Sequence, residues 1–414
     1  MQTPLYSKIL AINEKARFHM PGHSGKDFYE FKANKLDITE IEELDNLLTS
    51  SSVIKEAEDL IAKAYGYKHA LMATSGSTVC MQIVLYALKE LGYSIIAIGE
   101  MHSSFYNACR IFSIDYKEYK TKEDLLPKVD TRSAIFITSP NYFGKTKCLD
   151  RYKEYADLLV VDAAHGAHFA FSSILPEYPK ADIVFSSMHK TMPAQTGAAI
   201  INVNSDELYD NLKFARSLIH STSPNYMTMA SMDLARAYME ENSETLYKHI
   251  KEVVDIKKGK FAGYTIEKSD DISRLVINTG EYDAEGIAKD LHKLGFDVEM
   301  ALENKLVFIL TPFNIDALDE LESAITSIEA KPLKAIKGFN MGKRLVSSLD
   351  NLTPAFLEID DAEGYISNAT ICIYPPSIPV LNRGDKITKE DINILNQNKG
   401  RLLGLVNGKV PVLK

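Results

Sequence analysis

The sequence of 414 residues contains no tryptophan and only four cysteines. The cysteines are widely separated and form no CxxC pair; they are Cys80, Cys109, Cys148 and Cys372. Structural zinc sites use closely spaced cysteines, and disulfide frameworks belong to oxidising compartments. We therefore expect reduced thiols, no metal site and a cytoplasmic location.

Positive charge is also scarce, and so are long apolar runs. The chain has 47 Lys and Arg against 56 Asp and Glu, a formal net charge of −9. Binding to nucleic acid requires a basic face, so this balance argues against such a partner. No run reaches the roughly 18 apolar residues of a membrane span. The N-terminal apolar run is interrupted by Lys8, Glu14 and Lys15 and fits neither a secretory signal nor an anchor. The composition indicates a globular protein that binds small molecules and no membrane.

Two nucleotide-binding motifs are missing as well. No GxGxxG motif follows a strand-like run, so the sequence lacks the signature of a dinucleotide-binding fold. The stretch SPNYFGKT, residues 139–146, has Ser139 where a P-loop requires its first glycine. These departures argue against a nucleotide cofactor.

Short apolar runs alternate with helical patterns between about residue 65 and residue 203. The runs lie at 94–100, 133–140, 158–165, 182–187 and 197–203. Runs without in–out alternation are typical of strands buried on both faces of a mostly parallel sheet. Residues 79–91 predict a covering helix that ends at Gly92. The pattern predicts an α/β fold.

The chain beyond about residue 240 has a different pattern. It predicts strands at 274–280 and 305–312 and amphipathic helices at 284–295 and 315–330, which is typical of a smaller α+β domain. We expect an N-terminal arm at 1–60, a large domain at 61–240 and a small C-terminal domain at 241–414. The proline-dense stretch 368–387 is too apolar for a disordered tail, so we expect it to pack against the body.

Reactive side chains follow the predicted strands. Ligands of open α/β sheets bind beyond the carboxyl ends of the strands, so we expect one crevice to contain His102, Asn141, residues 162–168 and residues 187–190. The stretch TSGSTVCMQ, residues 74–82, places small and hydroxyl side chains just before a helix, where free N–H groups favour an anion such as phosphate. Plain N-capping by Ser77 is the alternative, and it is preferred when this motif is taken alone.

The stretch VVDAAHGAHF places Asp162 at a strand end, followed by His165 and His168. Two histidines in a loop differ from the helical pair of a zinc protease, which disfavours a metal site. A carboxylate rising from the floor of a sheet can keep a pyridine nitrogen protonated and so make the ring an electron sink. An N-cap or a salt bridge is the alternative.

Lys190 follows a buried-looking strand and has His189 beside it. Lysines are usually solvated, and a Schiff-base lysine needs apolar walls or other cations that lower its pKa. An anion-binding helix start, a strand-end aspartate and, some 28 residues later, Ser-x-His-Lys are together the parts that a pyridoxal phosphate enzyme requires.

The sequence resembles the pyridoxal-phosphate-dependent ornithine/lysine/arginine decarboxylase family, of the aspartate-aminotransferase fold type (fold type I). The matching segments occur in order: FHMPGHSG, DITEIEELDNL, TSGSTVCMQ, MHSSFYNA, TSPNYFG, VVDAAHGAHF, SSMHKTMPAQTG, STSPNYMTMASMD and YPPSIPVL. The resemblance implies a large cofactor-binding domain with a mostly parallel seven-stranded sheet and a smaller α+β domain. Because the chain starts almost directly at FHMPGH, we expect the short form without an N-terminal wing domain, as a dimer or tetramer.

The resemblance also implies residue roles. Lys190 would form a Schiff base with pyridoxal 5′-phosphate, Asp162 would pair with the pyridine nitrogen, and His102 would stack on the ring, with His165 on the opposite face. The phosphate would be held by Gly76, Ser77, Thr78, Ser187 and His189 and, from the neighbouring subunit of a homodimer, by Thr222 and Ser223. His102 and Lys190 both remain candidates for the proton donor to Cα.

The implied reaction is decarboxylation of arginine, lysine or ornithine to the amine and CO₂, as in polyamine biosynthesis. The chain departs from the usual family pattern, mainly on the substrate side, at Ser24, Ala163, Gly197 and Ser377. Candidate acids for the distal cation of the substrate are Asp37, Glu40, Glu42 and Glu43. A solvated helix face is the preferred interpretation for at least three of them.

Two other functions stay open. The first is another reaction at Cα on the same scaffold, such as transamination. Transamination would use a carboxylate-binding arginine, and Arg274 opens a predicted strand at a suitable place. A surface ion pair is the preferred interpretation of Arg274. The second alternative is a non-catalytic dimeric homologue, against which the presence of Lys190, Asp162 and His102 argues.

Overall fold

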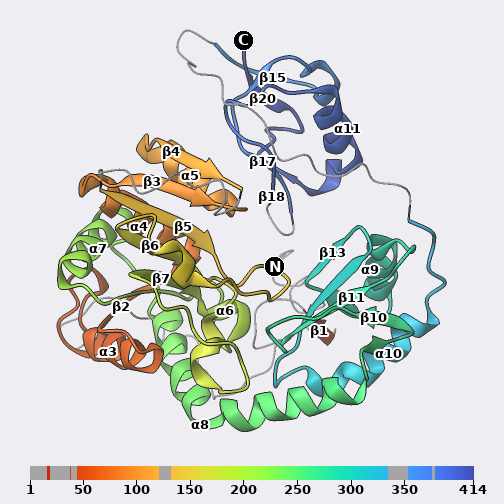
Figure 1. Cartoon of the computed structure of the whole chain (residues 1–414), viewed down its shortest axis with the longest axis horizontal. Coiled ribbons are helices and arrows are strands. Elements are labelled where there is room, and N and C mark those ends of the chain that lie inside the picture. The colour runs from red at the N-terminus through yellow and green to blue at the C-terminus, as the bar shows by residue number, and fades with distance from the viewer. Residues whose placement is uncertain (1–15, 19–37, 39–43, 121–131, 334–352, 375–377) are drawn as a thin grey trace, which may run out of the picture.

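The computed structural model describes residues 16–18, 38, 44–120, 132–333, 353–374 and 378–414. The FHMPGH segment after Phe18 and the acids Asp37, Glu40, Glu42 and Glu43 lie outside these residues, as do Ser24 and Ser377. Figure 1 shows three groups of elements: an α/β group in orange to green, a second group in green to light blue, and a third in dark blue.

The first group is built on a seven-stranded sheet with the order β2-β8-β7-β6-β5-β3-β4. Its strands are β2 (His69–Ala73), β3 (Ser94–Ile98), β4 (Tyr116–Tyr119), β5 (Ser133–Thr138), β6 (Leu158–Asp162), β7 (Ile183–Ser187) and β8 (Ala199–Val203). Of these seven strands, β8 alone runs in the direction opposite to the others. Every residue of β7 and β8 is buried, as the apolar runs require. The predicted mostly parallel sheet is confirmed.

Helices cover both faces of this sheet (Figure 1). Helix α3 (Val53–Tyr65) packs on one face, while α4 (Gly76–Glu90), α5 (Ser103–Phe112) and α7 (Asp206–Ile219) share the core of the other face. Helix α3 ends where Gly66 adopts a left-handed conformation with φ of 73°, in which its N–H satisfies two of the last carbonyls. The layers leave the carboxyl ends of the parallel strands at one edge of the sheet.

The long helix α8 (Tyr226–Ile256) runs from the first group to the second (Figure 1). The second group has an antiparallel sheet with the order β13-β14-β11-β10-β9, and the short strand β1 (Ala16–Phe18) pairs in parallel with β12 (Phe296–Val298). The remaining elements are β9 (Lys260–Phe261), β10 (Tyr264–Ile266), β11 (Arg274–Asn278), β13 (Met300–Leu302), β14 (Lys305–Ile309), α9 (Ala284–Lys293) and α10 (Leu318–Ser327). Buried residues of this sheet join the core around α3, so the two groups pack as neighbours.

The third group has its own small core. It consists of β15 (Pro354–Leu357), β16 (Ile366–Ser367), β17 (Ile371–Ile373), β18 (Ile378–Leu381), β19 (Leu402–Leu403), β20 (Val410–Leu413) and α11 (Lys389–Gln397). Arg110 of α5 donates to the carbonyl of Asn368 over 2.7 Å, so the start of the proline-dense stretch contacts the first group as expected. The division at residues 60 and 240 stays a prediction, because α8 passes residue 240 without a break.

Two further observations concern the composition. Cys80, Cys109 and Cys372 are buried free thiols, and Cys148 is an exposed one. Among the helices that the structure describes, none combines the length and the apolar character needed to cross a membrane.

Candidate active site

The functional side chains lie where the parallel strands end. Asp162 is the last residue of β6, and Ser187 is the last residue of β7. The short helix α6 (Met188–Thr191) follows β7 directly and carries His189 and Lys190. These ends meet at one edge of the sheet, the place where open α/β folds bind ligands.

The amine of Lys190 lies 3.0 Å from Nε2 of His165. Burial lowers the pKa of Lys190, and the positive charge of Arg274 lowers it further, whereas Asp162 and Glu299 act in the opposite direction. A lysine with a depressed pKa keeps a larger unprotonated fraction at neutral pH, and only that form attacks a carbonyl group. The position and surroundings of Lys190 therefore suit a nucleophilic amine.

Asp162 is a buried carboxylate, with only 4% of its surface exposed. Burial raises its pKa, while the N–H of Ala164, which donates to Oδ1 over 3.0 Å, and the charge of Lys190 lower it. Within the described part of the chain, Asp162 forms no ion pair. A carboxylate buried in this way is stabilised by any cation placed beside it.

Two imidazole rings flank the lysine. Burial and the charge of Lys190 lower the pKa of His102 to about 4. Burial, Lys190 and Arg274 hold the pKa of His165 well below its usual range, and the ring of Tyr142 lies 4.4 Å from the His165 ring. Both imidazoles are therefore neutral at physiological pH. The expected stacking of these rings on the two faces of a cofactor stays a prediction.

Arg274 is buried, with 3% of its surface exposed, so its interpretation as a surface ion pair is wrong. It opens β11 in the second group, yet its NH2 donates to Nδ1 of His165 over 3.1 Å. Its Nε lies 3.8 Å from the buried carboxylate of Asp271, and its NH1 makes no hydrogen bond within the described residues. The second group thus brings a positive charge to the neighbourhood of Lys190.

Glu299 is a further acid near Lys190 and was not among the residues predicted from the sequence. It lies between β12 and β13, is 6% exposed, and accepts a hydrogen bond from the hydroxyl of Tyr142 over 3.0 Å. Its charge raises the pKa of Lys190, which places it near the amine. One signal could have found it, namely an acid directly between the apolar residues Val298 and Met300.

The residues expected around a phosphate lie close to one another. The hydroxyl of Ser187 donates to Ser77 over 2.9 Å, and Nδ1 of His189 lies 3.1 Å from the carbonyl of Ala198. The N–H of Gly76 donates to the carbonyl of Gly197 over 2.8 Å.

N-capping of α4 by Ser77 is not observed. The helix begins at Gly76, and the residue in the N-cap position, Ser75, makes no side-chain hydrogen bond to the helix. Ser77 and the exposed Thr78 therefore lie in the first turn of α4, where backbone N–H groups are free.

Thr222 and Ser223 are exposed on the loop between α7 and α8. Their contact with the cofactor of a neighbouring subunit stays a prediction. No group of three or more His, Cys, Asp or Glu within the described ranges is arranged to hold a metal ion.

The family with the description "Orn/Lys/Arg decarboxylase, major domain" matches this chain over residues 3–113 and 109–282. The match covers more than half of the sequence. The chain belongs to the Orn/Lys/Arg decarboxylase family. The resemblance drawn from the nine ordered segments is thereby confirmed.

Members of the family and solved structures extend the likeness to the whole chain. This Orn/Lys/Arg decarboxylase family member is 26% identical to an arginine decarboxylase of Bacillus subtilis strain 168, over 96% of this chain and 94% of that protein. It is 25% identical to the uncharacterised protein YaaO of the same strain, with the same coverage. The structure of the constitutive lysine decarboxylase of Escherichia coli covers 100% of this chain and 82% of that one, with 17% identity and a TM-score of 0.67. A serine palmitoyltransferase of Sphingomonas wittichii matches 76% of this chain and 86% of that one, with 17% identity and a TM-score of 0.58. The expected fold type I is confirmed.

The side chains at the strand edge of this family member fit pyridoxal 5′-phosphate. A buried carboxylate without an ion pair suits a protonated pyridine nitrogen, and a lysine of depressed pKa suits an aldehyde. The N–H groups of the first turn of α4 that follow Gly76, beside Ser77 and Ser187, suit a phosphate. Each functional group of the cofactor thus has a matching partner among Asp162, Lys190 and the start of α4.

Proposed function

We propose that this protein decarboxylates a basic amino acid, namely arginine, lysine or ornithine, with pyridoxal 5′-phosphate as cofactor. The observation that carries the proposal is the convergence of Lys190, Asp162 and the start of α4 at one edge of the large sheet. Membership of the family supports the same reaction. The bound cofactor supplies an electron sink for the negative charge that remains on Cα when CO₂ leaves.

Three parts of the chain hold the cofactor in this proposal. Lys190 provides the amine that binds the aldehyde as a Schiff base, and its depressed pKa keeps that amine reactive. Asp162 compensates the charge of the pyridine nitrogen from the floor of the sheet. The first turn of α4 holds the phosphate together with Ser187 and His189.

His102 is suited to move a proton at Nε2. Its Nδ1 accepts a hydrogen bond from the N–H of Ser104 over 3.2 Å, so in the neutral ring the proton resides on Nε2. His102 and Lys190 are both proposed as donors of the proton that Cα receives, and solvent exchange into the product of variants at each position distinguishes them.

Glu299 is proposed as the acidic partner for the distal cation of the substrate. It is buried, it is near enough to Lys190 to affect its pKa, and the hydroxyl of Tyr142 orients one of its oxygens. A buried carboxylate gains more from a bound cation than a solvated one does, because water does not screen the pair. Glu299 is therefore a better candidate for substrate selection than an acid on a solvated helix face.

Transamination remains a second candidate because of one observation: among the residues with a described structure, NH1 of Arg274 has no hydrogen-bond partner. A guanidinium buried beside Lys190 can bind the carboxylate of an amino acid substrate. A carboxylate bound in this way stays on the substrate and is not released as CO₂. Detection of CO₂ and an amine would support decarboxylation. Detection of a keto acid with all carbons retained would support transamination.

A homodimer with shared active sites, in the cytoplasm, is part of the proposal. Phe214 and Leu218 lie one turn apart on α7 with 59% and 54% of their surfaces exposed, and Thr222 and Ser223 follow on the next loop. Exposed apolar side chains that are neighbours on a helix favour contact with another subunit. Light scattering of the purified protein measures the mass directly, and a monomer at micromolar concentration would contradict the shared site.

The experiment that tests the function is an absorbance spectrum of the purified protein with added cofactor, followed by separate incubation with arginine, lysine and ornithine. An absorption band that is lost in Lys190→Ala, together with CO₂ from one amino acid, would support the proposal and identify the substrate. A band without CO₂ or keto acid would favour the non-catalytic alternative. If no band forms, the cofactor assignment is wrong.

A further inference from the structure

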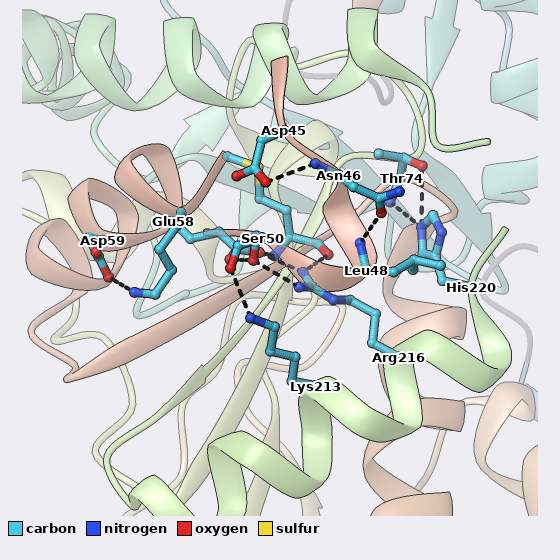
Figure 2. Close-up of polar contacts among 12 residues, drawn as sticks. Asp45, Asn46, Leu48, Ser50, Glu58, Asp59, Thr74, Lys213, Arg216 and His220 are labelled. Atoms are coloured by element: carbon cyan, nitrogen blue, oxygen red, sulfur yellow. Dashed lines mark hydrogen bonds and ion pairs between the residues drawn. The ribbon is translucent and has the colours of Figure 1, made fainter. Parts of the chain in front are cut away.

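The free edge of β2 is capped by side chains of helices instead of a further strand. Among the strands that the structure describes, β2 is the first in the order of the sheet and pairs only with β8, so the backbone groups on its other edge need partners. The N–H of Met72 donates to Oε1 of Glu58 over 2.9 Å, and its carbonyl accepts from NH1 of Arg216 over 3.1 Å. Just beyond the strand, the N–H of Thr74 donates to Nε2 of His220 over 3.1 Å. Figure 2 shows Glu58 and Arg216 next to each other and His220 beside Thr74.

Arg216 and His220 both belong to the C-terminal end of α7. Arg216 lies in the last turn of the helix, and His220 is its C-cap residue, whose N–H donates to the carbonyl of Arg216. Arg216 and Glu58 form an ion pair with neither side chain exposed, and the hydroxyl of Ser50 donates to Oε2 of Glu58 over 2.9 Å (Figure 2). This pair holds the strand itself. His220 holds the first residue of the segment that leads into α4.

The hydrogen bonds of His220 define its protonation state. Nδ1 lies 3.1 Å from the carbonyl of Ser221 and donates to it, which leaves Nε2 as the acceptor that the N–H of Thr74 requires. Burial lowers the pKa of His220, the nearby charge of Arg216 also lowers it, and the carbonyl of Ser221 opposes them. A neutral ring with its proton on Nδ1 satisfies both contacts.

Thr74 is held by several groups. Besides its N–H bond to His220, its Oγ1 accepts from the N–H of Asn225 at 3.5 Å. Its carbonyl lies against Gly197, where a Cβ would approach that oxygen to 2.7 Å. Gly76, two residues further along, donates its N–H to the carbonyl of Gly197. Only one residue separates Thr74 from the start of α4 at Gly76. The backbone of this segment therefore has little conformational freedom once Thr74 is held in place.

We propose that His220 is a positioning residue that, by binding Thr74, sets where the first turn of α4 presents its N–H groups to the phosphate of the cofactor. The inference rests on the proposed function, since it assigns the phosphate to residues 76–78. Hydrogen bonds from backbone N–H groups to phosphate are directional, so a displacement of the turn weakens them. His220 does not itself contact the phosphate in this proposal.

The test compares two aldehydes that differ only in the phosphate. Apo protein is titrated with pyridoxal 5′-phosphate and with pyridoxal, and the absorption band reports each dissociation constant. We expect His220→Ala to weaken binding of pyridoxal 5′-phosphate about tenfold, the equivalent of one lost hydrogen bond. Binding of pyridoxal, which lacks the phosphate, should not change. His220→Gln, whose amide oxygen can occupy the place of Nε2, should bind pyridoxal 5′-phosphate nearly as well as the wild type.

His69→Ala is the matched control. His69 lies at the other end of β2, where its Nε2 is 2.7 Å from Asp206, so its loss should leave both dissociation constants unchanged. Equal weakening of both aldehydes by His220→Ala, or none, would overturn the positioning role. If His220→Ala does not fold, His220→Asn replaces it, because the oxygen of Asn lies near the place of Nδ1 and does not reach Thr74. Failure of the wild type to bind either aldehyde would overturn the cofactor assignment and, with it, this inference.

Discussion

Arg274 donates a hydrogen bond from its NH2 to Nδ1 of His165, although Arg274 opens β11 of the antiparallel sheet and His165 lies in the loop after β6 of the large sheet. His165 in turn places Nε2 3.0 Å from the amine of Lys190. The second group of elements therefore acts on the reactive lysine through a neutral imidazole and through the charge of Arg274. The active site depends on the packing of two sheets, and it cannot be assembled by the large sheet alone.

Arg274→Gln should raise the pKa of Lys190, because it removes a positive charge that disfavours the protonated amine. The rate at which the absorption band forms with pyridoxal should then rise at a higher pH than in the wild type. Measurement of this rate between pH 6 and 10, roughly the range in which a depressed lysine titrates, gives the shift. Arg274→Lys keeps the charge and is the control; an identical profile for Arg274→Gln and the wild type would contradict the assignment.

Glu299→Gln should raise the KM for the basic amino acid and leave formation of the cofactor band intact. A charge-assisted hydrogen bond contributes about 1.5–3 kcal/mol, so KM should increase by roughly tenfold to a hundredfold. Steady-state release of CO₂ at several substrate concentrations measures the effect. Glu299→Asp retains the negative charge, so its KM should increase less than that of Glu299→Gln. An unchanged KM would show that the distal cation binds elsewhere.

Arg216→Ala should destabilise the fold strongly, because it leaves Glu58 charged and without its cation where neither side chain is exposed. Loss of one partner of a buried ion pair typically costs about 3–5 kcal/mol of the free energy of unfolding. Unfolding in urea measures the change. Lys180→Ala is the control: its pair with Glu177 is 76% and 83% exposed, so its loss should cost less than about 1 kcal/mol. Similar costs for the two variants would contradict the buried clamp.

His102 should make the folded protein sensitive to acid. Its pKa is about 4 in the folded chain and 6.5 in an unfolded one. Below pH 6.5 the unfolded chain therefore binds a proton that the folded chain does not, so this stabilising contribution is complete above pH 6.5 and declines as pH falls toward 4. Urea unfolding at a series of pH values should show a weaker decline in His102→Gln. Parallel curves for the two proteins would rule out this contribution.

Much of the fold follows from the sequence because the large sheet is buried on both faces. Its strands appear as unbroken apolar runs, and the structure places β3, β5, β6, β7 and β8 within the predicted runs. The separate core after residue 353 was not predicted, since its strands are two to four residues long and carry too little periodicity. Pairing of β1 with β12 also has no local signal, because it joins segments far apart in the sequence.

The candidate site could be predicted where its residues directly follow strands. Asp162, Ser187 and Lys190 fall into this class, because parallel strands end at a common edge. Arg274 and Glu299 do not, since they come from the second group of elements and reach Lys190 only through the packing of that group against the first. Arg274 also shows why exposure cannot be inferred from residue type alone. Arginine is rarely buried in proteins, but Arg274 is buried.

Gly197 has a φ of +98°, and a side chain there would collide with the carbonyl of Thr74. The loop after Lys190 and the loop before α4 therefore cannot change in sequence independently of each other. A residue larger than glycine at position 197 requires a different backbone path for residues 74–76. Substitutions in the two loops should be inherited together. Libraries that randomise one loop alone should return glycine at 197, whereas libraries that randomise both should also recover larger residues there.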